Sequence, residues 1–150
     1  MSVTTRDTIR DAVAAMLESE LTGSGPVAAV YGYQRSKLAG ESPVQTVTSA
    51  GSERKPSGYA ETGARFFLTL TTFVLHSKAE EGWTEEMAEA ALDAIEGATA
   101  EALLSHQQTA DWQNIQYAAR SVVETVISLD GFVYRRETTP ILVECEDDQA

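Results

Sequence analysis

Residues 65–76, RFFLTLTTFVLH, constrain the fold more than any other segment of the chain. The side chains of a β-strand alternate between two faces, and here both faces are largely apolar. One face carries Phe66, Leu68, Leu70 and Val74, and the other carries Phe67, Thr69, Thr71, Phe73 and Leu75. Because a strand that is apolar on both faces needs cover on both sides, we expect a central strand of a sheet. We also expect Leu68, Leu70 and Val74 to be buried against helices.

Two helices are expected, one before this strand in the sequence and one after it. Residues 4–21 carry one apolar stripe with spacings of three and four positions, formed by Ile9, Val13, Met16, Leu17 and Leu21. Residues 23–26, GSGP, end this helix. Thr84 is a suitable N-cap for a second helix, which continues to about Gln107 with an alanine-rich packing face.

Four further segments have the composition of strands, and together with the helices they define a fold class. They are residues 27–34, 43–49, 121–128 and 132–143, and the last two flank Asp130-Gly131, a strong hairpin signal. Pro140 indicates a break or an edge position in the last strand. We expect a flexible loop over residues 50–63 and a frayed acidic tail over residues 144–150. The order helix, three strands, helix, two strands predicts a single α+β domain over residues 1–150, with one mainly antiparallel sheet packed against two helices.

The charge of the chain excludes some classes of partner. The 150 residues include 11 Lys and Arg and 23 Asp and Glu, which gives a net charge of −12. Residues 1–75 hold seven basic and seven acidic side chains, whereas residues 76–150 hold four and sixteen. A basic nucleic-acid-binding protein is therefore disfavoured, and no apolar run reaches the length of a membrane helix. We expect a protein made in the cytoplasm without membrane association, whose acidic half is either a solvated face or a functional surface.

No residue pattern in the chain indicates catalysis. A P-loop, a dinucleotide-binding glycine motif and a nucleophile elbow are all missing from the sequence. One cysteine, Cys145, and two histidines, His76 and His106, do not provide the usual zinc spacings. The carboxylates at 80, 81, 85, 86 and 89 form either a solvated face or a weak cation site. We therefore expect no enzyme activity, no cofactor and no resident metal.

Several stretches, taken in order, resemble the tail terminator (tail-completion, neck) proteins of tailed phages and prophages. They are the helix at 4–21, the aromatic run at 30–33, residues 43–54, the strand at 65–76, the helix start at 83–86, the linker containing Trp112 and the hairpin at 129–137. The similarity is one of order and local composition across nearly the whole chain. It implies an α/β fold with a sheet packed against two helices, and a virion structural protein that binds no cofactor. The insertion at 50–63 departs from the small members of that class.

The resemblance further implies a homo-oligomeric ring, typically a hexamer, at the head–tail junction. Such a ring caps the tail tube, contacts the tail tube protein and joins it to the head–tail connector or stopper protein, while DNA passes through the channel without specific binding. A head-to-tail ring needs two complementary surfaces on each subunit. Candidate interaction residues come from a basic segment and an acidic stretch: Arg35, Lys37, Arg54, Lys55, Arg65, Glu85, Glu86 and Glu89. Acidic residues that face a channel would also repel passing DNA.

Three other functions are compatible with the sequence. One is a head-completion or stopper protein, which occupies the neighbouring ring of the neck. Another is a small-ligand-binding α+β domain with a pocket lined by Phe66, Phe73 and Trp83. The third is a small hydrolase whose site has no recognisable motif. The mass of the protein in solution separates a ring from a monomeric ligand-binding domain.

Overall fold

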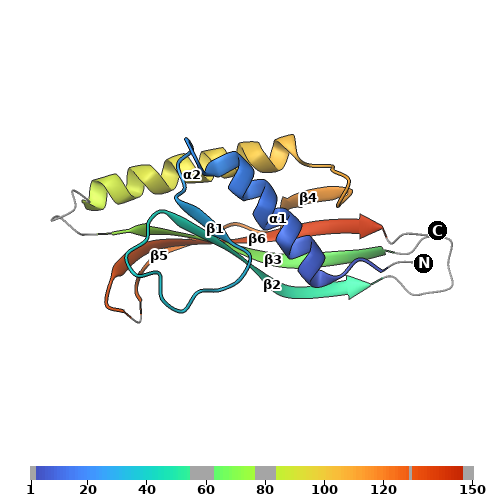
Figure 1. Cartoon of the computed structure of the whole chain (residues 1–150), viewed down its shortest axis with the longest axis horizontal. Coiled ribbons are helices and arrows are strands. Elements are labelled where there is room, and N and C mark those ends of the chain that lie inside the picture. Colours follow the sequence, from blue (N-terminus) through green and yellow to red (C-terminus); the bar gives the residue numbers. More distant parts are fainter. Residues whose placement is uncertain (1–2, 55–62, 77–83, 129, 147–150) are drawn as a thin grey trace.

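A computed structural model describes residues 3–54, 63–76, 84–128 and 130–146 of the chain. It is an α+β domain in which a mixed six-stranded sheet packs against two helices (Figure 1). The elements, in order, are α1 (Arg6–Leu21), β1 (Ala29–Tyr31), β2 (Val44–Arg54), β3 (Gly63–Leu75), α2 (Glu85–Ser105), β4 (Asn114–Tyr117), β5 (Val122–Ile127) and β6 (Val133–Glu146). The second half thus holds three strands after α2 rather than the two expected, because the predicted linker around Trp112 leads into β4.

The sheet is mainly antiparallel, with one parallel pair at its edge. The strand order is β1-β2-β3-β6-β4, and β5 also pairs with β6. Strands β1 and β2 are parallel, and every other pair is antiparallel. Both β4 and β5 lie on the same edge of β6, one after the other: β4 pairs with residues 141–144 and β5 with residues 133–138.

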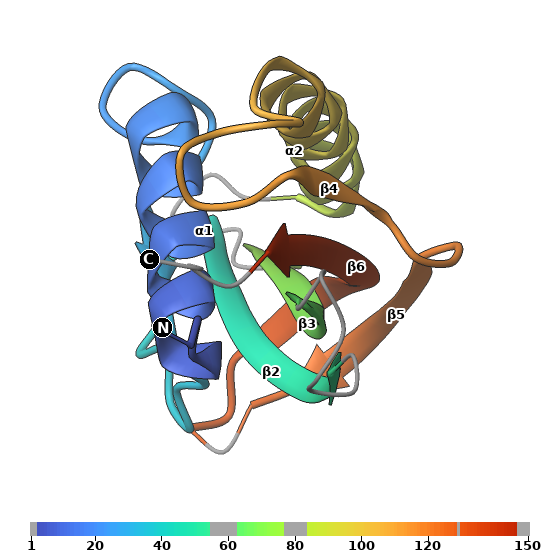
Figure 2. The same ribbon diagram turned by 90° about the vertical axis from the view of Figure 1, so that its right-hand side faces the viewer.

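Strand β3 is central, as its two apolar faces predicted. It pairs with β2 on one side and with β6 on the other. Leu68, Leu70 and Val74 are buried in one core cluster together with residues of α1 and α2, such as Leu17 and Leu92. Both helices lie on this face of the sheet (Figure 2). The main core therefore forms between the sheet and the two helices.

The opposite face of the sheet is covered at one end by the loop between β1 and β2. Leu38 of this loop packs with Val44, Leu75 and Tyr134 in a second buried cluster. The backbone N–H of Ala39 donates to Asp130 Oδ2 at 2.8 Å, which ties the loop to the β5–β6 hairpin. The rest of this face carries threonines, which are Thr46, Thr48, Thr69, Thr71 and Thr138. The second face of β3, which was expected to be covered, is thus covered by a loop at one end only and forms a polar surface beyond that loop.

Two strands extend further than the sequence indicated. Strand β2 continues to Arg54 through a β-bulge between Ser49 and Gly51, so residues 50–54 belong to the sheet and not to a flexible loop. Likewise, residues 144–146 belong to β6 and pair with the start of β3, and Cys145 is buried. These positions correct the expected loop and tail, whose remaining residues, 55–62 and 147–150, lie outside the described part of the chain.

Pro140 lies inside β6, at the point where its outer neighbour changes from β4 to β5. In an antiparallel strand, the N–H and C=O of one residue point toward the same neighbour. The Pro140 carbonyl accepts from the N–H of Ala118, so the N–H that proline lacks would also point toward this junction, away from β3. Pro140 thus takes the place of an edge residue only at this junction, although β6 itself lies inside the sheet. It removes no hydrogen bond from the β3–β6 ladder.

Helix α2 begins at the predicted cap and ends two residues early. Thr84 is the N-cap and accepts a hydrogen bond from the Met87 N–H at 3.2 Å. The C-cap is His106, whose Nε2 lies 2.9 Å from Glu20 Oε1 of α1 and so links the two helices. The indole N–H of Trp112 donates to the His106 carbonyl at 2.8 Å and fixes the turn that leads into β4. Within the described residues, no helix is long and apolar enough to cross a membrane.

Candidate assembly surfaces

The predicted basic segment does not form one surface, because its residues lie at opposite ends of the sheet. Arg54 and Arg65 lie where β2 ends and β3 begins. Arg35 and Lys37 belong to the loop that packs over Leu75 at the other end of β3. Ten residues of strand separate Arg65 from Leu75, which corresponds to about 33 Å. Lys55 lies outside the described residues.

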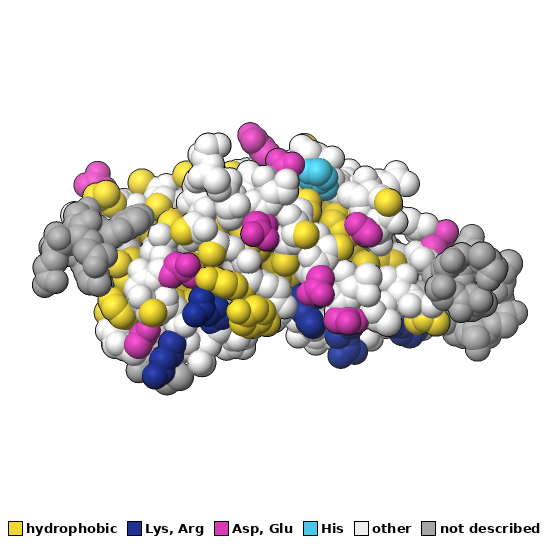
Figure 3. Space-filling view, viewed as in Figure 1, with side chains coloured by type: hydrophobic (Ala, Val, Ile, Leu, Met, Phe, Trp, Pro, Cys, Tyr) yellow, Lys and Arg dark blue, Asp and Glu magenta, His cyan; other side chains and the backbone are white. Residues whose placement is uncertain are grey.

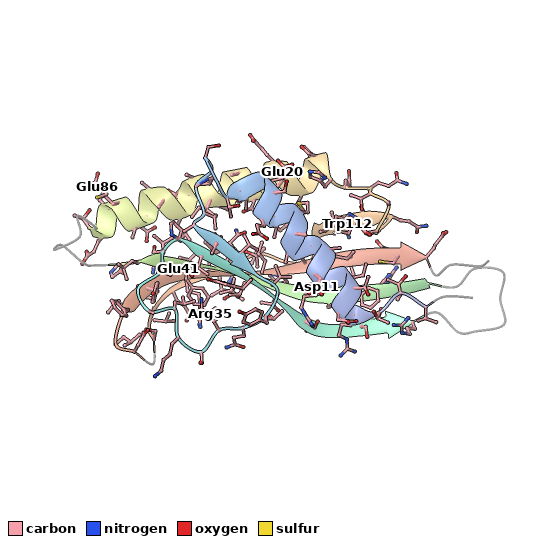
Figure 4. All side chains as sticks on the ribbon, in the orientation of Figure 1. Asp11, Glu20, Arg35, Glu41, Glu86 and Trp112 are labelled. Carbon is pink, nitrogen blue, oxygen red and sulfur yellow. The ribbon has the colours of Figure 1, made fainter. Side chains whose placement is uncertain are left out.

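Arg35 is held within its own loop and β1. Its Nη1 donates to the Tyr31 hydroxyl at 2.8 Å and lies 3.5 Å from Glu41 Oε1. The guanidinium also lies over the Tyr31 ring, 4.7 Å from its centroid. The Tyr31 hydroxyl donates to Glu41, and this bond raises the pKa of Tyr31. Arg35 lies below the sheet in Figure 4. Lys37 is exposed, so it is the cation of this loop that remains available to a neighbour.

Arg54 and Arg65 also have partners in the same chain. Arg54 Nη2 donates to the Thr4 carbonyl at 2.9 Å, and its guanidinium lies 5.6 Å from the centroid of the Phe66 ring. Arg65 lies 3.9 Å from Glu53 and 3.6 Å from Glu144, on the two neighbouring strands. All three side chains of this ionic group are more than one-third exposed, so the pairs contribute little to stability. Their charges largely neutralise one another, which weakens this end as a basic surface.

The acidic stretch at the start of α2 is partly used inside the fold. Glu89 forms an ion pair with Arg135 of β6, and Glu85 lies 4.0 Å from His76 Nε2. Glu86 is exposed and lies in the first turn of α2 (Figure 4). Arg135 of the sheet is therefore paired with a helix residue. Within the described residues, no group of three or more His, Cys, Asp or Glu side chains is placed to hold a metal ion.

The outer face of α2 carries acidic side chains and no basic side chain. The helix contains six acidic residues and no basic residue. Glu86, Asp93 and Glu101 are exposed, and they lie opposite the side that carries the buried residues Ala88, Ile95 and Ala102. These three carboxylates make no ion pair with the described residues. The exposed basic side chains seen in Figure 3 lie mostly along the lower half of that view, below the helices. Among the described residues, this face of α2 therefore presents three unpaired carboxylates to solvent.

Strand β5 exposes apolar side chains that the sequence did not single out. Its other edge faces no strand of the described chain. Val122, Val123 and Ile127 are 54%, 40% and 75% exposed, and Tyr117 at the end of β4 is 41% exposed. The sequence VVETVI could have given the signal, because a strand with Val or Ile on both faces and a free edge cannot bury them all. The β4–β5 edge is a candidate contact surface.

The pocket expected for a small ligand does not form. Phe66 faces the helices, whereas Phe73 faces the opposite side of the sheet, and Trp83 lies outside the described residues. A different cavity of about 200 Å³ lies between α2 and the sheet, beside the junction of β4 and β5. Its lining combines the polar side chains of Thr72, Thr99 and Glu137 with apolar surface from residues such as Leu70. Its volume is below the range of about 300–1,000 Å³ that is usual for ligand pockets.

This cavity adjoins a buried hydrogen-bonded cluster in the core. The Gln45 side-chain amide donates to the hydroxyls of Thr72 and Thr99 at 3.2 and 3.0 Å, while its carbonyl oxygen is buried without a partner among the described groups. Ser121 donates to Glu137 at 2.6 Å. Burial, together with Glu96 and Glu137, raises the pKa of Tyr117 at the cavity edge.

A comparison with protein-family models and with curated proteins finds no match to this chain.

Proposed function

We propose that this protein is a structural virion protein, a tail terminator that forms a ring on the tail tube and joins it to the head connector. The observation that supports the proposal most is the agreement of the coarse fold. The resemblance implies a sheet packed against two helices, and the described chain has this architecture.

The charge distribution supports a specific orientation of the subunit in the ring. The outer face of α2 presents Glu86, Asp93 and Glu101 to solvent, without basic residues on the helix. A surface of this kind lining a channel repels the phosphate backbone of DNA and prevents the DNA from binding to the wall. We therefore place the outer face of α2 toward the channel. Contacts between subunits then come from other surfaces.

The ring is tested by measuring the mass of the protein in solution, alone and with the tail tube protein of the same phage. Light scattering after size-exclusion chromatography should give about six times the 16.2 kDa subunit mass, and electron microscopy should show rings. Ring formation that needs the tube protein also supports the proposal. Monomers that neither form rings nor attach to tubes, in both conditions, would contradict it.

The orientation is tested by removing three charges from α2. The variant Glu86→Gln, Asp93→Asn, Glu101→Gln should assemble like the parent, since none of these side chains has an ionic partner among the described residues. Its rings should retain double-stranded DNA at low salt, where the parent rings do not, because electrostatic binding to DNA is strongest there. If the variant fails to assemble, the outer face of α2 is a subunit contact and not a channel wall.

A matched control removes the same number of charges elsewhere on the surface. Asp11, Glu18 and Asp111 are exposed and lie outside α2. The variant Asp11→Asn, Glu18→Gln, Asp111→Asn has the same net charge as the α2 variant. It should leave DNA retention at the parent level. Equal retention by both variants would show that net charge, and not the channel wall, controls DNA binding.

A further inference from the structure

The outer edge of β5 lacks the features that usually protect a free strand edge. Such edges carry bulges, prolines or charged side chains that prevent pairing with another chain. The free part of the β2 edge has a bulge at Ala50 and ends in Glu53 and Arg54. Strand β5 is regular over all six residues, and its single charge, Glu124, is paired with Arg136. An edge with exposed Val and Ile side chains and no such protection is suited to pairing with another strand.

The hydrogen bonds of the β5–β6 hairpin show which backbone groups of β5 point outward. The Ser128 N–H donates to the Phe132 carbonyl, so Ser128 points toward β6. The direction alternates along a strand, so residues 122, 124 and 126 also point toward β6. The N–H and C=O groups of Val123, Thr125 and Ile127 therefore point away from the sheet. This edge offers three donors and three acceptors in regular spacing.

We propose that this edge pairs antiparallel with the same edge of a second copy of the chain, with Thr125 opposite the partner's Thr125. In this register Val123 lies opposite the partner's Ile127, and all outward groups of both strands form hydrogen bonds. On the helix side of the sheet, Val123 of each copy packs against Ile127 of the other copy, which gives two equivalent apolar contacts. The two Thr125 side chains face each other across the two-fold axis. Apolar and Thr–Thr cross-strand pairs of this kind are favourable.

The charges of β5 favour this register over its neighbours. In a symmetric pair whose sheet keeps its helices on one side, only registers centred on a residue are possible. A pair centred on Glu124 would bring two carboxylates directly opposite each other, which is destabilising. A pair centred on Val126 would leave Val123 beyond the partner's Ile127. Only the register centred on Thr125 matches all three outward residues and places Glu124 opposite the partner's Val126.

The contact is small and independent of the ring. Six residues of strand span about 20 Å. A contact along this length alone buries less surface than a standard interface, which buries about 800 Å² per partner. Pairing through β5 alone should therefore depend on protein concentration. A symmetric contact closes at two copies, whereas a ring requires head-to-tail contacts between different surfaces. The β5 pairing is therefore a separate proposal from the ring, and either proposal can be wrong while the other is correct.

The first test uses sedimentation equilibrium of the full chain over a range of concentrations. The parent should show a dimerisation step, and Ile127→Lys should weaken this step at least tenfold, because it replaces an apolar contact on both sides of the dyad. Leu104→Lys is the matched control, since Leu104 is 74% exposed on α2, away from the edge. It should dimerise like the parent. A parent without a dimerisation step, or equal effects of the two variants, would overturn the proposal.

The second test fixes the register by disulfide cross-linking in a Cys145→Ser background. Thr125→Cys should form a covalent dimer under mild oxidation, since opposed residues lie about 5.5 Å apart between Cα atoms, within disulfide range. Val123→Cys should not, because the two copies of this residue lie about 14 Å apart. The pair Val123→Cys, Ile127→Cys should cross-link again. If Val123→Cys alone links as readily as Thr125→Cys, the register is wrong; rings that never cross-link would refute this pairing while leaving the terminator proposal intact.

Discussion

Leu68 and Leu70 offer a direct test of how the cavity beside α2 affects the core. Both are leucines of β3, both face the helices, and they are 1% and 2% exposed. Truncation of either to alanine removes about three carbon atoms, which corresponds to roughly 2.4 kcal/mol of transfer free energy at about 0.8 kcal/mol each. An additional cost arises from the void that remains, so buried Leu→Ala changes usually total about 2–5 kcal/mol.

The two leucines should differ in this second contribution. Leu70 lines the cavity of about 200 Å³, whereas Leu68 does not. The space left by Leu70→Ala joins a cavity that is already open to water, so we expect about 2–3 kcal/mol for Leu70→Ala and about 3–5 kcal/mol for Leu68→Ala. Urea unfolding of the two variants and the parent, with equal slopes, measures the difference. A loss below about 1 kcal/mol for either variant, or a larger loss for Leu70→Ala, would refute the reasoning.

Further predictions concern one tyrosine and two glycines. Burial raises the pKa of Tyr134 to about 12 from 10.0, so between these pH values the folded state keeps a proton that the unfolded state loses. The free energy of unfolding should therefore fall by up to about 2.7 kcal/mol as the pH rises from 10 to 12. The free energy of unfolding of the Tyr134→Phe variant should fall less over this range. A Cβ on Gly63 would lie 2.6 Å from the Cys145 carbonyl oxygen, so Gly63→Ala should cost about 1–3 kcal/mol and lower the melting temperature. Gly97→Ala meets no atom within 4 Å in an exposed helix position and should instead stabilise by about 0.5–1 kcal/mol, and an unchanged or lower melting temperature would contradict this.

The elements with strong periodicity could be predicted from sequence, and their ends could not. The stripe of α1, the Thr84 cap and the two-faced strand β3 each carry a local signal over many residues. Strand β4 carries almost none, because only Ile115 of its four residues is buried and it forms on an edge of β6 left free by β5. The alternation of buried Ile141, Val143 and Cys145 does continue into the acidic tail. The prediction of a frayed end there was based on the charge of the tail and not on this alternation.

The candidate surfaces were harder to predict, because they depend on contacts between distant segments. Nothing in the local sequence of Glu89 indicates that it meets Arg135, 46 residues away. The basic segment had a net positive charge in sequence, yet the β2–β3 ladder places Arg65 beside Glu53 and β6 adds Glu144. Charge counted along a chain therefore predicts the sign of a surface poorly where strands bring opposite charges together.

The position of Pro140 also limits how the C-terminal hairpin can misfold. Strand β6 is long enough to serve as a template for several registers of β5, and its outer edge would otherwise be uniform. A slip of β5 by two residues toward β4 keeps its side chains on their proper faces, so burial alone does little to prevent it. That slip brings Val122 opposite Pro140, where the missing N–H leaves the Val122 carbonyl without a partner. The proline therefore acts against a competing fold rather than for the native one, and its effect should appear in the yield of correctly folded protein more than in its stability.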